Sequence, residues 1–143
     1  TLIHSFESRI KFIYGDILLE QLLFNLGRLG AADVTGIIDN NKQFTNFKFE
    51  TNIFLDNLKR FYNKFGIYNK QTIPYDLFIS GNFDLINLIM RLDEISGNNK
   101  FTEEDVAYIE NEFNDLLLDD GYANLFNFLK FKEFIRLVAT ESN

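Results

Sequence analysis

The segment from Phe101 to Val138 constrains the fold of this chain more than any other, because it contains two well-bounded apolar patterns. The first block, FTEEDVAYIENEF, begins with Thr102 as a candidate N-cap, and Asp105 three residues later completes an acidic variant of the capping box. Behind this cap the apolar residues recur at helical spacing, at Val106, Ile109 and Phe113. The block therefore predicts a helix with one inward-facing apolar stripe.

The second block, FLKFKEFIRLV, changes its period along its length. Leu129 and Phe131 are one residue apart, as in an extended segment, and the apolar positions from Phe134 onward follow the helical period. This change of period predicts a short extended piece that leads into an amphipathic helix.

A helix, a loop, a short extended piece and a second helix follow one another in an EF-hand. FTEEDVAYIENEF resembles the entering helix of the last EF-hand of the calmodulin superfamily, and LKFKEFIRLV resembles its exit. The resemblance implies an all-α, EF-hand-like, calmodulin-type fold of two lobes, with degenerate loops and very short paired strands. Residues 1–65 would form the N-terminal lobe and residues 66–143 the C-terminal lobe, while an ordinary helical bundle remains the alternative.

The rest of the chain is compatible with this organisation. Apolar residues at helical spacing predict helices over residues 3–13, 17–30, 31–39, 52–65 and 83–95. Alternating residues predict short extended pieces at Phe47 and Phe49 and again at Ile73 and Tyr75. QFTNFKFETNIF, TIPYDLFIS and FLKFKEFIRLV therefore read as weak internal repeats of an extended piece followed by a helix.

The loops between these elements lack the ligands of a calcium site. A calcium-binding EF-hand loop needs oxygens at positions 1, 3, 5 and 12 and a glycine at position 6. The nearest candidate is Glu94–Asp105, with oxygens at Glu94, Ser96, Asn98 and Asp105, but Asn99 stands where the glycine should be. We therefore expect no bound calcium and no other metal or cofactor.

Composition excludes several functional classes. A net charge of −7 argues against nucleic acid as a partner and suits a basic one. The chain has no cysteine and a single histidine, His4, and it has no phosphate-binding glycine loop, so we expect no enzymatic activity and no catalytic residues. No apolar run approaches the roughly 18 residues that span a bilayer. These features predict an intracellular protein, cytoplasmic or associated with the cytoskeleton and a motor complex, without direct membrane insertion.

Calcium-free EF-hand units in two lobes resemble myosin light chains, and among these the apicomplexan light chains of the myosin A tail-interacting and essential types. The resemblance implies that the chain clamps a basic, amphipathic, IQ-type helix of a myosin heavy chain, largely independently of calcium. The implied partner-helix groove consists of Leu85, Ile89, Met90, Ile109, Phe113, Phe134, Leu137 and Val138. For any single one of these residues the helical spacing favours an ordinary core position, because a stripe at this spacing marks burial without indicating the partner. An alternative is a small all-helical viral assembly or toxin-neutralising protein that binds a folded basic partner.

Overall fold

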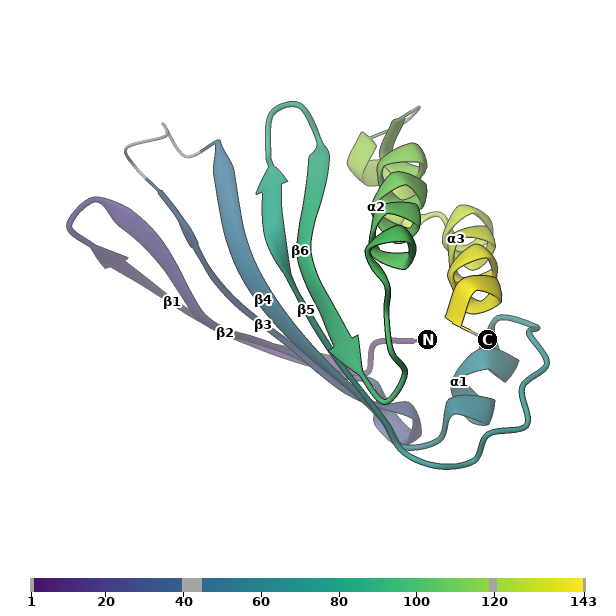
Figure 1. The fold of residues 1–143 in the computed structure, drawn as a ribbon. Coiled ribbons are helices and arrows are strands. Elements are labelled where there is room, and N and C mark those ends of the chain that lie inside the picture. Colours follow the sequence, from purple (N-terminus) through teal and green to yellow (C-terminus); the bar gives the residue numbers. More distant parts are fainter. Residues whose placement is uncertain (1, 40–44, 119–120, 143) are drawn as a thin grey trace.

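The computed structural model describes residues 2–39, 45–118 and 121–142, and its centre is a six-stranded antiparallel sheet (Figure 1). The strands follow one another in chain order, β1-β2-β3-β4-β5-β6, so each pairs with its neighbours in sequence. The strands are β1 (Ser5–Ile13), β2 (Asp16–Asn25), β3 (Gly30–Ile38), β4 (Asn46–Leu55), β5 (Tyr75–Asp84) and β6 (Ile89–Gly97). The helices are η1 (Gly27–Leu29), α1 (Leu58–Lys64), α2 (Glu103–Leu118), η3 (Gly121–Phe126) and α3 (Phe128–Ser142).

The central strands form because apolar and polar residues alternate along them. In β4, Phe47, Phe49 and Leu55 point to the same side of the sheet, and the intervening residues are mostly polar. Phe47 pairs with Phe83 of β5 and Leu55 pairs with Tyr75, so one face of both strands is mostly apolar. This is the face that the helices cover, and we refer to it as the helix side of the sheet.

The buried core lies between this face and the helices, in two clusters. One gathers around Phe49, Phe83 and Leu117 of α2. The other joins Leu55 to α1 and receives Ile135 of α3 at its border. The core is continued by rings from α1 and α3, because Phe65 after α1 is 0% exposed and its ring centroid lies 6.0 Å from that of Phe131.

Side chains of α2 cap the free edge of β6. Asn114 accepts a hydrogen bond from the Met90 backbone N–H (2.7 Å) and donates one to the Met90 carbonyl (3.0 Å). Glu110 accepts one from the Leu92 N–H (2.8 Å). An edge strand otherwise presents unpaired backbone groups to pairing with another chain. In β6 these two side chains take the place of a seventh strand.

Irregular pairing in two strands keeps their apolar residues on the helix side. In β2, Leu19 lies opposite Gly36 and Leu22 lies opposite Val34, so two residues of β2 stand against one of β3 between these pairs. The same irregularity occurs in β6, where Leu92 and Ile95 both face the helix side. Such a β-bulge resets the two-residue period. Without it, every side chain beyond the irregularity would turn to the other face.

Two hairpin turns are locally encoded. The β1–β2 turn places Tyr14 (φ 49°) and Gly15 (φ 86°) in the left-handed region, as a two-residue type I′ turn requires. In the β5–β6 turn, Asp84 accepts hydrogen bonds from the backbone N–H groups of Ile86 (2.9 Å) and Asn87 (2.8 Å). It also accepts one from the Asn87 side chain (2.9 Å), so one carboxylate organises this turn.

The expected all-α, EF-hand-like fold is wrong, because most of the chain before residue 98 is strand. The predicted helices over 3–13, 17–30, 31–39 and 83–95 are instead β1, β2, β3 and the β5–β6 hairpin. Only the end of the predicted 52–65 helix is helical, as α1. The EF-hand and all-α descriptions therefore do not apply to this protein.

The C-terminal expectations are partly confirmed. The predicted cap of α2 forms, because Thr102 Oγ1 accepts from the Asp105 N–H (3.1 Å) and Asp105 accepts from the Thr102 N–H (2.8 Å). The extended piece at Leu129 and Phe131 is wrong, since both residues lie within α3. The proposed lobe boundary at residues 65 and 66 falls between α1 and β5, and β4 before it pairs with β5 after it.

Candidate functional site: an open apolar face of the sheet

On the helix side of the sheet, β1 and parts of β2 and β3 carry apolar side chains that lie outside both buried clusters. Cross-strand partners share a face, so the pairing places one continuous set of side chains there. We call this set the open apolar face, and it consists of Phe6, Ile10, Phe12, Ile17, Leu19, Leu22 and Ile38. None of these seven residues packs against either buried cluster.

The position of the helices explains why this face is open. α2 packs along β6 and α3 packs on α2, whereas β1 and β2 form the far side of the sheet (Figure 1). Exposure rises toward that side, because Phe6 is 65% exposed, Ile10 54% and Phe12 78%. Phe24 and Val34 mark the border, since they pack against the buried clusters.

Charged residues of β1 and β2 lie on the opposite side of the sheet. Arg9 donates a hydrogen bond to Gln21 (3.0 Å), and Lys11 forms an ion pair with Glu20 (2.8 Å) across the two strands. Glu7 lies opposite Leu23. On the helix side of β1 and β2 the single polar side chain is Ser8. The opposite face of this hairpin therefore combines charged residues with Leu18 and Leu23, whereas its helix side is apolar apart from Ser8.

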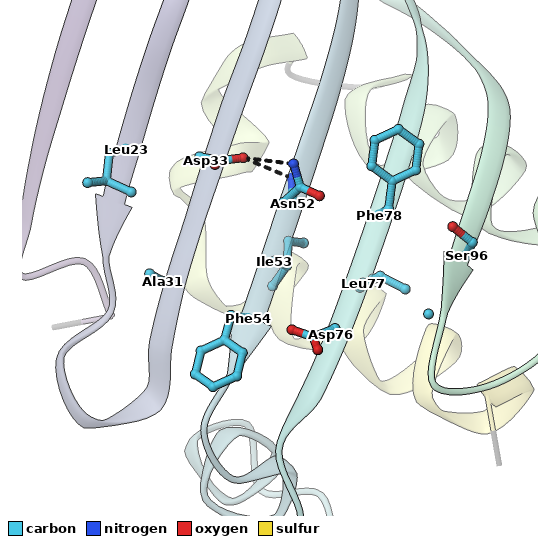
Figure 2. Close-up of a pocket in the computed structure, with 11 residues that line it drawn as sticks. Leu23, Ala31, Asp33, Asn52, Ile53, Phe54, Asp76, Leu77, Phe78 and Ser96 are labelled. Carbon is cyan, nitrogen blue, oxygen red and sulfur yellow. Dashed lines mark hydrogen bonds between the residues drawn. The ribbon is translucent and has the colours of Figure 1, made fainter.

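We call the side of the sheet opposite the helices the polar face. It contains a shallow hollow of about 350 Å³ (Figure 2). Aromatic rings of Phe54 and Phe78 line it together with the carboxylates of Asp33 and Asp76. Asp33 already accepts hydrogen bonds from the backbone and side-chain nitrogens of Asn52, each at 3.2 Å. Part of its hydrogen-bonding capacity is thus used within the sheet, and this hollow is a weaker candidate than the open apolar face.

A second hollow, of about 400 Å³, lies between β6 and the start of α2. It includes part of the segment that sequence analysis identified as the nearest calcium-like loop. Glu94 and Ser96 of that segment lie in β6, whereas Asp105 lies in α2 and caps it. The segment is thus a strand end, a turn and a helix start. Within residues 2–39, 45–118 and 121–142, no three His, Asp or Glu side chains gather as a metal site would require.

The residues assigned to a partner-helix groove are placed mainly in the packing between β6, α2 and α3. Leu85, Met90 and Phe113 pack around the Phe49–Phe83–Leu117 cluster, and Ile109 is buried. Phe134 of α3 contacts Phe113 with ring centroids 5.8 Å apart. Leu137 and Val138 are half-buried on α3, whereas Ile89 is exposed at the start of β6. Most of the set therefore joins α2 to its neighbours.

The open apolar face was not predicted from the sequence, because its residues were assigned to amphipathic helices. The usable signal was the alternation of Ile17 with Leu19 and of Leu22 with Phe24, after the turn sequence IYGD. The step of three residues between Leu19 and Leu22 interrupts this alternation, and it is also compatible with a helix.

No helix among the described residues is long and apolar enough to cross a membrane. No family model matches the sequence, and neither the curated proteins nor the solved structures contain a significant match to it.

Proposed function

We propose that this protein binds the hydrocarbon chain of a lipid or fatty acid on the open apolar face. The observation that carries the proposal is the composition of that face, which presents leucine, isoleucine and phenylalanine side chains over three adjacent strands. Monomeric proteins rarely expose contiguous apolar patches, and those they expose are commonly binding sites.

The dimensions of the face suit an extended chain. β1 has 9 residues and β2 has 10, which corresponds to a length of about 30 Å along the strands. Burial of each methylene contributes about 0.8 kcal/mol, so a chain that places even half of its methylenes against this face binds with several kcal/mol. A half-open site also leaves a polar headgroup in water.

The lack of charge on this face favours a hydrocarbon chain over a basic helix. A basic amphipathic helix needs acidic side chains beside its apolar contact, as electrostatic complementarity requires. The acidic residues of β1 and β2 nearest to it, Glu7 and Glu20, lie on the opposite face. The earlier expectation of a calcium-independent myosin helix as partner stays a prediction, and so does that of a folded basic partner.

The four leucines of β2 provide a matched test. Leu19 and Leu22 point to the open apolar face, whereas Leu18 and Leu23 point to the polar face of the same strand. We expect Leu19→Thr/Leu22→Thr to weaken binding of a fluorescent 18-carbon fatty acid about thirtyfold, because each of the two changes removes roughly 1 kcal/mol of apolar contact. Leu18→Thr/Leu23→Thr makes the same chemical change on the other face, and it should leave the affinity within about twofold.

Threonine keeps the strand propensity of these positions, and circular dichroism and thermal melting verify that both variants fold. The proposal is refuted if the wild-type chain does not bind the fatty acid at micromolar concentration. It is equally refuted if both double variants lose binding to the same extent. If a basic amphipathic peptide displaces the fatty acid and binds more tightly than the fatty acid does, the result would favour the prediction of a basic helix as the partner.

A further inference from the structure

The two edges of the sheet are treated differently. The β6 edge is capped by Asn114 and Glu110 of α2, as described above. β1 pairs only with β2 among the described residues, so its outer backbone groups have no strand beside them. β1 contains no proline, and the extra residue of the β1–β2 irregularity belongs to β2, so neither a proline nor a bulge of its own blocks this edge.

We propose that β1 pairs antiparallel with β1 of a second copy of this chain, with Ser8 opposite Ser8 of the partner. Directly opposite residues in an antiparallel pair share a face, so this arrangement keeps both open apolar faces on one side. The two sheets then form one sheet of twelve strands with an α2–α3 pair at each end. This inference does not rest on the proposed binding of a hydrocarbon chain.

Charge complementarity selects the register. With Ser8 at the centre, Glu7 of each copy lies opposite Arg9 of the other, which creates two cross-strand pairs of opposite charge. Moving the centre to Arg9 would place two arginines opposite each other. Moving the centre to Glu7 would place two glutamates opposite each other. Of these three registers, only the one centred on Ser8 places unlike charges opposite each other and no like charges opposite each other.

The same register also extends the apolar contact. Phe6 of one copy lies opposite Ile10 of the other, on the helix side, and these side chains are 65% and 54% exposed in the single chain. Aromatic and β-branched side chains form favourable cross-strand pairs. Glu7 forms no ion pair within the described part of the single chain, and the partner's Arg9 provides one.

Charge exchange tests both the pairing and its register. In analytical ultracentrifugation we expect Glu7→Arg, or Arg9→Glu, to raise the dissociation constant of the dimer roughly tenfold or more, because each change opposes like charges at two positions. The double variant Glu7→Arg/Arg9→Glu should restore pairing. Mixing the two single variants should also restore it, as a heterodimer in which every opposed pair is again of unlike charge.

A cysteine introduced at the centre gives an independent measurement. The chain has no cysteine, so Ser8→Cys provides a single thiol that would face its own copy. Opposed Cα atoms in an antiparallel pair lie about 4.5–5.5 Å apart, within the range that a disulfide spans. We expect Ser8→Cys to cross-link far faster than Lys70→Cys, an exposed control position outside the sheet.

The inference is overturned if the wild-type chain stays monomeric at several hundred micromolar. Equal cross-linking of the two cysteine variants would also overturn it, as would failure of the double exchange to restore pairing. None of these results depends on fatty-acid binding. Conversely, a dimer that binds no fatty acid would support this inference while refuting the proposed function.

Discussion

The capping of β6 by α2 predicts that Asn114→Ala destabilises the fold. Asn114 makes two hydrogen bonds with the Met90 backbone, at 2.7 and 3.0 Å. Each is worth about 1 kcal/mol net, so their loss costs about 2 kcal/mol. Alanine is a better helix former than asparagine by about 0.5 kcal/mol, which leaves a net loss of about 1.5 kcal/mol.

Asn111→Ala is the matched control, because Asn111 is exposed on the same helix and makes the same gain in helix propensity. Urea denaturation should therefore separate the two variants by about 2 kcal/mol in the free energy of unfolding. In a chain of this size the difference corresponds to about 4–8 °C in melting temperature. Variants that differ by less than about 0.5 kcal/mol would show that α2 does not cap the β6 edge.

Two further predictions concern the hairpin turns. Tyr14→Asn should raise the free energy of unfolding, measured by urea titration, by about 1 kcal/mol. Asparagine tolerates the left-handed conformation, and the Tyr14 ring is fully exposed, so its removal loses no packing. A destabilised variant would contradict the turn geometry. Hydrogen bonds from the Asn87 backbone and side chain, then from Ile86, lower the pKa of Asp84 below its ordinary value of 3.8. The ionised Asp84 carboxylate therefore stabilises the fold at pH values above 3.8, the ordinary pKa of the group. This stabilisation is lost as the pH falls through the lower pKa that Asp84 has in the folded protein. We expect the difference in free energy of unfolding between the wild type and Asp84→Asn, measured by urea titration at a series of pH values, to become smaller as the pH falls. A difference that does not change with pH would refute the role of the charge.

The features predicted correctly from sequence are those set by near neighbours. The Thr102–Asp105 cap depends on residues three apart, and the structure contains both of its hydrogen bonds. The alternation of Phe47 with Phe49 likewise indicated an extended segment, which is β4. Neither feature requires knowledge of the rest of the fold.

Two of the strands that were mistaken for helices, β2 and β6, contain bulges. In β2 the apolar step from Leu19 to Leu22 is three residues, and in β6 the step from Leu92 to Ile95 is also three. A step of three also occurs along one face of a helix, so an apolar pattern with a single bulge imitates the helical period. The bulge itself is set by pairing with neighbouring strands, which a single sequence does not reveal.

The open apolar face was missed for a related reason. β2 carries leucines on both faces, with Leu18 and Leu23 on one and Leu19 and Leu22 on the other. A strand of this kind resembles a buried helix in composition. Deciding which face is covered requires the position of α2, which follows from long-range packing against β6.

The widths of the two layers explain why part of the sheet stays open. Five inter-strand gaps of about 4.8 Å make the sheet roughly 24 Å wide, whereas one helix covers about 10 Å. Because α2 lies along the β6 edge and α3 packs on α2 and on the α1 end of the core, the layer of helices does not extend over β1 and β2. An apolar sheet face is stable in water when another layer covers it. The described helices supply that layer for half of the sheet and leave the outer edge of β1 without a strand beside it. The proposed hydrocarbon ligand would cover the open face, and the proposed second copy would pair with the edge.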